Sequence, residues 1–222
     1  MPDNPDKVRI DVVSDVVSPR CFIGKRRLEK AIALTPDIPV EVHYHPFFLN
    51  DWIPAEGISR EQYLTTKFGS PERYKEIAQR VSAAADEDGL VYAVDKVNRQ
   101  PNTTDSHRLI HWAGQQGKAA EMKQRLMDLY FSQGADLSDK TVLASAGADV
   151  GLDADKVAEL LDSDADLDTV TKQVETAKSA GIQGVPFFIF NNALAVSGAQ
   201  APEQLADVIR RAAEEKTQKT AS

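Results

Sequence analysis

Hydrophobic and polar positions at the start of the chain follow the pattern of a strand, a helix and a second strand. Val8–Ser14 is almost continuously apolar and β-branched, which indicates a buried strand. Ser18 followed by Pro19 is a strong helix start, and the chain turns again just after Leu34. Val40–Phe48 alternates between apolar and polar residues and predicts a second strand. A helical crossover between the two strands implies that they pair in parallel.

The middle of the chain, from Ile58 to about Lys178, changes to the spacing of helices. Strand-like alternation nearly disappears, and Val91–Asn98 is expected to be an extended connector. Serine-proline and glycine positions separate the helical stretches. The predicted helices cover residues 71–86, 104–116, 118–131, 139–149, 154–161 and 167–180.

The strand pattern returns after Gly181. Two short apolar runs, Phe187–Asn191 and Ala193–Ser197, are separated by an Asn-Asn pair that suits a tight hairpin turn. A last helix is predicted over Pro202–Glu214, followed by a frayed polar tail over Lys216–Ser222.

This order predicts an α/β fold in which a helical block interrupts a small central sheet. One domain is expected to combine residues 7–54 with residues 178–216, and residues 55–177 form the helical insertion. A chain of 222 residues is long enough to bury a substantial core in this way.

Composition narrows the partners and the possible chemistry. The net charge of -8 argues against nucleic acid and anionic membranes as partners, and the chain has no apolar run of membrane-spanning length. Met1–Lys7 is polar and lacks the apolar core of a signal peptide, so we expect a cytoplasmic protein. The single cysteine, Cys21, excludes an internal disulfide and a zinc site built on several thiolates. The oligomeric state is left open.

The segment Ser18-Pro19-Arg20-Cys21 lies at a strand-to-helix turn and has two interpretations. In the first, Ser18 is an ordinary N-cap and Cys21 a small core residue. In the second, the unpaired N–H groups of the helix start favour a thiolate supplied from outside, to which Ser18 donates a hydrogen bond.

Other polar residues are weaker candidates for a functional role. The basic residues Arg20, Lys25, Arg26 and Arg27 either attract an anionic ligand such as glutathione or form a solvated helix face. His107 is a candidate acid or base, although a bracing role is the simpler expectation. His43 and His45 share one strand face, but no third ligand is evident, so we predict no metal site.

Several segments, spread over almost the whole chain, carry a resemblance to a known family. They are DVVSPRCFIGKRRLE around Asp15–Glu29, HPFFLN at His45–Asn50, PNTTDSHRLIHWA at Pro101–Ala113, and GVPFFIF and SGAQ within Gly184–Gln200. The chain resembles the DsbA family, and within it the FrnE-like oxidoreductases. The resemblance implies a thioredoxin fold with a large all-helical insertion. It also implies a cis proline at Pro186, facing the active-site turn and leaving the preceding backbone free to pair with glutathione or an extended peptide.

The same resemblance implies a set of site residues. Ser18 and Cys21 occupy the catalytic positions of the family. The expected substrate-binding positions are Pro19, Arg20, Val185, Pro186, Asn102, Thr103, Ser197 and Gly198.

The active-site motif departs from the family pattern. FrnE-like proteins typically carry Cys-Pro-Trp-Cys, so Ser18 replaces the nucleophile and Arg20 the tryptophan. Kappa-class glutathione transferases and 2-hydroxychromene-2-carboxylate isomerases use a serine at this position, but they usually have an Asp-Arg pair where this chain has Gly198-Ala199-Gln200-Ala201. Three hypotheses therefore remain: one-thiol chemistry at Cys21, a glutathione-dependent transferase or isomerase that uses Ser18, and a non-catalytic peptide binder.

Overall fold

A mixed four-stranded sheet forms the centre of the computed structural model, which describes residues 7–220. The strands are β1 (Val8–Ser14), β2 (Val40–Pro46), β5 (Phe187–Phe190) and β6 (Leu194–Ser197), in the order β2-β1-β5-β6. β1 pairs in parallel with β2 and antiparallel with β5, and β5 pairs antiparallel with β6. The predicted parallel pair and the predicted hairpin are both confirmed.

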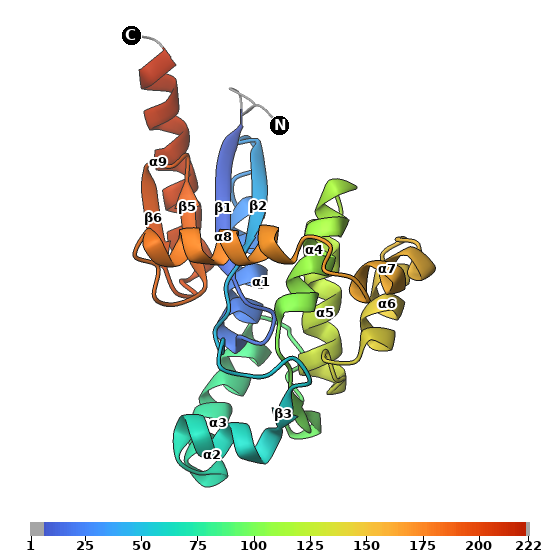
Figure 1. Cartoon of the computed structure of the whole chain (residues 1–222). Helices are drawn as coiled ribbons and strands as arrows, with labels where there is room; N and C mark the ends of the chain where they lie inside the picture. The colour runs from blue at the N-terminus through green and yellow to red at the C-terminus, as the bar shows by residue number, and fades with distance from the viewer. Residues whose placement is uncertain (1–6, 221–222) are drawn as a thin grey trace.

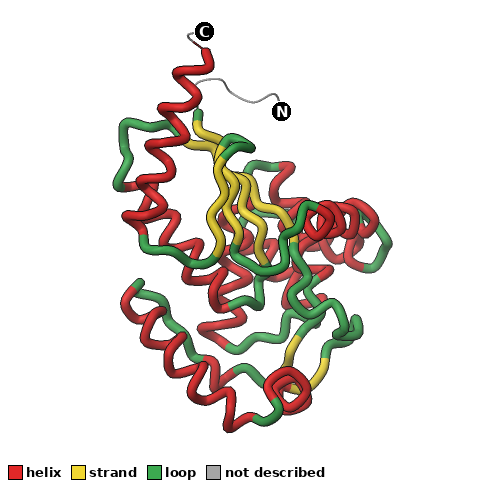
Figure 2. The backbone as a smooth tube through the Cα atoms, turned by 90° about the vertical axis from the view of Figure 1, so that its left-hand side faces the viewer, coloured by secondary structure: helices red, strands yellow, loops and turns green. Residues whose placement is uncertain are grey.

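Helices cover the sheet on both faces (Figures 1 and 2). α1 (Pro19–Ala33) and α9 (Pro202–Thr220) pack against each other on one face, and α8 (Leu167–Ser179) crosses the sheet on the other. The core between the sheet and the α1–α9 pair is apolar. It contains Val12, Leu28, Phe188, Phe190 and Ile209.

The remaining elements lie between β2 and α8 in the sequence. The helices are α2 (Arg60–Phe68), α3 (Pro71–Glu87), α4 (Thr104–Gln115), α5 (Ala119–Gln133), α6 (Lys140–Asp149) and α7 (Ala154–Leu161). A short 3₁₀ turn, η1 (Val94–Lys96), and a two-stranded ladder of β3 (Ile58–Ser59) with β4 (Arg99–Gln100) accompany them. In Figure 1, α2 and α3 lie below the carboxyl ends of β1 and β2.

The observed elements confirm most of the predicted helices and strands to within a few residues and correct others. The tail predicted to fray from Lys216 is helical as far as Thr220, because α9 continues beyond Glu214. The connector predicted as extended over Val91–Asn98 contains the 3₁₀ turn, and the helix α2 has no counterpart among the predicted helices. α8 contacts both α4 and β2, and the domain division at residue 177 stays a prediction.

Asn191 and Asn192 form the tight turn between β5 and β6. Both residues have positive φ angles, of 50° and 54°. Asparagine tolerates this left-handed conformation better than most residues. The turn also closes onto β1, because Arg9 N donates to Asn191 Oδ1 over 2.9 Å.

Candidate active site

Ser18 begins α1 at the carboxyl end of β1. Its backbone is extended, and its Oγ accepts a hydrogen bond from Cys21 N over 3.3 Å, which makes it the N-cap of the helix. Pro19 follows as the first helical residue, where its missing N–H costs nothing. The interpretation of Ser18 as an N-cap is therefore confirmed. A helix start of this kind also presents unpaired N–H groups to an anion.

Cys21 lies one turn into α1, behind Ser18, and its side chain is buried with 1% of its surface exposed. Burial raises the pKa of the thiol from 9.0 to about 11. The Ser18 hydroxyl and the Lys123 ammonium act in the opposite direction, but burial outweighs them. The thiol therefore remains protonated at neutral pH, and it is a weak nucleophile.

A cis peptide bond joins Val185 to Pro186, as the family resemblance implies. The proline packs directly on α1, because a Cβ added at Gly24 would lie only 2.8 Å from Pro186 Cγ. Gly198 N donates to Pro186 O over 2.8 Å, which fixes the loop from the other side. The structure thus brings Pro186 and Gly198 together beside α1. Within residues 7–220, the backbone N–H and C=O of Val185 make no hydrogen bond.

Asp15 lies beneath this turn and is fully buried. One carboxylate oxygen accepts a hydrogen bond from Leu49 N over 2.8 Å, and the other lies 3.1 Å from His107 Nε2. Burial lowers the pKa of His107, although Asp15 opposes that effect. The pair connects the β1–α1 turn, the loop after β2, and α4. His107 accordingly braces the insertion, which is the simpler of the two roles that the sequence suggests for it.

Lys123 on α5 is a second buried charge near the turn. Its side chain is 1% exposed, and its ammonium lies 5.6 Å from the centre of the Tyr44 ring. Burial lowers the pKa of Lys123 to about 8, while Cys21 and Asp15 act to raise it. Sequence analysis did not single out Asp15 or Lys123 as functional residues. Asp15 had a signal, since it directly follows a buried strand, whereas Lys123 looks like any surface lysine of a helix.

The sequence matches the DSBA-like thioredoxin domain over residues 9–210. The chain belongs to this DsbA-like family. A probable DsbA oxidoreductase from Streptomyces coelicolor is 30% identical, with a TM-score of 0.85 over 92% of this chain and 89% of that chain.

Two more distant structures share the fold. One is a 2-hydroxychromene-2-carboxylate isomerase, 14% identical, with a TM-score of 0.71 over 95% of this chain and 98% of that one. The other is the cytosolic disulfide reductase DsbM from Pseudomonas aeruginosa, solved with GSH, 16% identical, with a TM-score of 0.62 over 95% of this chain and 98% of that one.

The side chain of Asn102 is hydrogen-bonded to the backbone at both ends of its amide in this DsbA-family chain. Its Nδ2 donates to Ile53 O over 2.7 Å, and its Oδ1 accepts from Thr104 N over 2.9 Å. Thr103, the N-cap residue of α4, is buried. Their assignment to substrate binding stays a prediction, and the contacts that the structure shows for Asn102 are structural.

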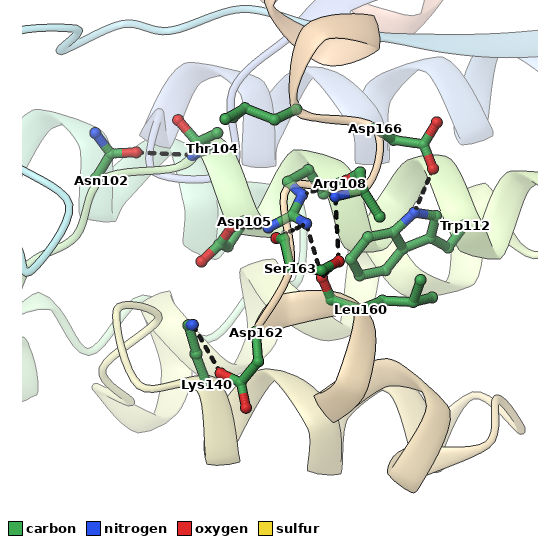
Figure 3. A network of polar contacts seen from close by, with 12 residues as sticks. Asn102, Thr104, Asp105, Arg108, Trp112, Lys140, Leu160, Asp162, Ser163 and Asp166 are labelled. Carbon is green, nitrogen blue, oxygen red and sulfur yellow. Dashed lines mark hydrogen bonds and ion pairs between the residues drawn. The ribbon is translucent and has the colours of Figure 1, made fainter.

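The same segment contains Arg108, whose buried guanidinium binds the connection between α7 and α8 (Figure 3). It donates to Leu160 O, Ser163 O and Ala165 O over 2.6–2.8 Å and to Asp105 Oδ1 over 2.7 Å. These carbonyls belong to a helix end and the turn after it, where backbone acceptors lack helical partners. The matched segment at residues 101–113 is therefore to a large extent a scaffold for the insertion.

Three basic residues of α1, Lys25, Arg26 and Arg27, lie beside negatively charged or carbonyl oxygens. Lys25 Nζ lies 2.5 Å from Glu29 Oε1, and Arg26 Nε lies 3.3 Å from the other carboxylate oxygen of Glu29. Arg27 bonds to Asp88 over 2.6 Å and to the carbonyl of Ala199 over 2.8 Å. Their positive charge is largely neutralised, which favours a structural role for these three residues. Arg20 and Ser197 lie on the exposed surface.

The described part of the chain, residues 7–220, contains no group of three or more His, Cys, Asp or Glu side chains placed to hold a metal ion. His43 and His45 instead lie beside Glu41 and Asp11, with separations of 3.1 Å and 2.6 Å. No helix within the same residues has both the length and the apolar character needed to cross a bilayer.

Proposed function

We propose that this DsbA-family protein binds glutathione at the start of α1 and acts as a glutathione-dependent transferase or isomerase. In this proposal Ser18 donates a hydrogen bond to the sulfur of the ligand. The observation that carries it is the contrast between two neighbouring residues. The only cysteine is buried with a raised pKa, whereas the serine in front of it caps the helix beside the cis proline.

Ser18 has the geometry of a donor to sulfur. The Ser18 Oγ already accepts a hydrogen bond from Cys21 N, so the hydroxyl hydrogen remains available for donation. In the unliganded chain the Ser18 hydroxyl acts on the Cys21 thiol and lowers its pKa, against the larger effect of burial. A ligand thiol at the helix start would receive the same help from the hydroxyl and from the helix dipole. Ser18 is 3% exposed, so ligand binding requires the residues that cover it to move.

The unpaired backbone of Val185 supplies the second half of the site. An extended ligand gains affinity when its backbone pairs with free N–H and C=O groups of the protein. Glutathione offers both a peptide backbone and a thiol. The bound thiol loses its proton to water, and the resulting thiolate adds to an activated carbon–carbon double bond of the second substrate, whose π electrons take up a proton from water at the neighbouring carbon. A transferase releases this thioether, whereas in an isomerase the adduct loses that proton and expels the thiolate again after rotation about the new single bond.

Two of the structural neighbours support this choice of ligand. DsbM was solved with GSH, and a second neighbour is a 2-hydroxychromene-2-carboxylate isomerase. DsbM is described as cytosolic, which is consistent with the cytoplasmic location that we propose for this chain. The FrnE-like subgroup remains part of the proposal and is not needed for the chemistry.

A thermal-shift titration tests the proposal. With a dissociation constant of about 1 mM, about 10 mM glutathione stabilises the protein by about 1.4 kcal/mol, which raises Tm by about 3–6 °C for a chain of this size. Ser18→Ala should remove most of this shift, and S-methylglutathione, which has no thiol to ionise, should give little.

The controls separate this function from its alternatives. Ser18→Cys restores the second sulfur, so a gain of insulin-reducing activity would show that the DsbA frame is intact. A shift of equal size in wild type and Ser18→Ala would indicate a peptide binder that ignores the serine. The absence of a shift in wild type would refute glutathione as the ligand.

A further inference from the structure

An unpaired amide donor lies on the insertion side of the active-site turn. Asn50 is 7% exposed, and its Nδ2 is buried with no partner within hydrogen-bond distance among the described residues, although the amide is close enough to Tyr63 to lower the pKa of that hydroxyl. Its other amide atom, Oδ1, accepts a hydrogen bond from Lys67 Nζ over 2.5 Å. A lysine only donates, so this contact identifies Oδ1 as the end of the amide that Lys67 binds and leaves the NH₂ group of the same amide available to an acceptor. A buried donor without a partner is costly and calls for an explanation.

The position of Asn50 ties it to Ser18. The preceding residue, Leu49, donates its N–H to the Asp15 carboxylate over 2.8 Å, and Ser18 N donates to Asp15 O over 3.3 Å. Asp15 therefore holds the start of α1 and the Leu49–Asn50 loop against each other. Figure 1 shows α2, which carries Lys67, below the carboxyl ends of β1 and β2, where this turn lies.

Lys67 brings a positive charge to the same place. Its ammonium lies 5.4 Å from the centre of the Tyr63 ring, which holds the side chain over a buried aromatic face. Burial lowers the pKa of Lys67, Asp15 opposes that effect, and Arg60 adds to it. The ammonium is thus only partly compensated by the charges around it. The neighbouring carboxylate of Asp51 is paired with Lys178 over 2.8 Å.

We propose that Asn50 Nδ2 and Lys67 Nζ form a subsite for a carboxylate of the ligand whose sulfur binds at Ser18. This inference rests on the proposed function. A carboxylate matches the two groups, because it accepts one hydrogen bond from the amide and a charge-assisted one from the ammonium. A peptide thiol with a free carboxylate would then be selected over a thiol without one.

The test measures how the ligand carboxylates and Lys67 depend on each other. Dissociation constants of glutathione and of glutathione diethyl ester are measured by titration calorimetry for wild type and for Lys67→Met. In wild type the ester should bind about three- to tenfold more weakly, since a partly exposed charge pair contributes modestly. In Lys67→Met the two ligands should bind alike. Lys75→Met removes another exposed lysine charge, from the next helix, and it should keep the wild-type ratio.

Asn50→Ala provides a second arm and should weaken glutathione binding more than binding of the diethyl ester. Because Asn50 is buried, its folding is checked by circular dichroism, and Lys67→Met, at an exposed position, carries the test if Asn50→Ala unfolds. If glutathione binds in a Ser18-dependent manner but the ester ratio is the same in wild type and Lys67→Met, the subsite is wrong and the proposed function stands. If wild type binds no glutathione, the proposed function itself fails.

Discussion

The reactivity of Cys21 decides between redox chemistry and the function proposed for Ser18. Labelling by iodoacetamide requires both a thiolate and access to the sulfur. The pKa of Cys21 is raised from 9.0 to about 11, so its thiolate fraction at neutral pH falls about a hundredfold. The side chain is also 1% exposed, so most labelling must wait for a local or global opening of the structure.

These two effects act in the same direction. We therefore expect the labelling rate of Cys21 at pH 7.5 to be more than about a hundredfold slower in the native protein than in urea. Mass spectrometry of the intact chain measures the modified fraction over time, and the single cysteine makes the signal unambiguous. The Ser18→Ala variant tests the direction in which the serine changes the reactivity of Cys21. The Ser18 hydroxyl lowers the pKa of Cys21, so its removal should slow labelling further wherever the native state itself reacts.

A native rate within about tenfold of the unfolded rate would refute this reasoning, because burial would then neither protect the thiol nor keep it protonated. That result would revive one-thiol chemistry, in which Cys21 forms a mixed disulfide with glutathione or a client protein. Slow labelling that becomes fast only on unfolding removes this mechanism and leaves Ser18 as the residue that meets the ligand.

Further predictions concern the contacts that support the site. Gly24→Ala places a methyl group 2.8 Å from Pro186 Cγ, and it should destabilise the protein by about 1–3 kcal/mol in urea unfolding, although alanine normally favours a helix. Asp11 is buried, and although burial acts to raise its pKa, hydrogen bonds from His45 and Arg9 lower it well below its usual range. It therefore stabilises the fold above about pH 4 and loses that contribution as the pH falls, so Asp11→Asn should flatten the acid side of the Tm–pH curve. Arg108→Met should cost about 3 kcal/mol or more, whereas Arg125→Met, at a half-buried position with one ion pair to Asp149, should cost less than about 1 kcal/mol.

Local signals in the sequence account for the elements that were predicted well. The Ser18-Pro19 start of α1 depends on residues that are neighbours in the chain, as does the Asn191-Asn192 turn. The end of α9 was placed too early because its last turns are polar. They are nevertheless helical, and Lys216 Nζ reaches back to the carbonyl of Lys7 over 2.5 Å. A contact across that many residues has no signature in a local pattern.

The site could be predicted only in part for the same reason. The resemblance located Ser18, Cys21 and Pro186, because the family motif marks them. It did not show that residues from other elements bury Cys21, since the burial of this side chain depends on how α5 and the insertion pack over the turn. The Lys67 side chain is an ordinary lysine in the sequence, and its contact with Asn50 appears only when α2 is placed.

Asp15 connects the two halves of the proposed site. It carries no exposed surface, yet the start of α1, the loop before Asn50, and His107 of α4 all bond to it. Burying a carboxylate costs free energy, which the hydrogen bonds from Leu49 N and His107 offset. Together with the bond from Ser18 N to Asp15 O, these bonds hold Ser18 on one side of Asp15 and Asn50 on the other, where we propose that one ligand spans both. A double-mutant cycle between Ser18→Ala and Lys67→Met should then show that the two residues contribute to glutathione binding through the same bound molecule.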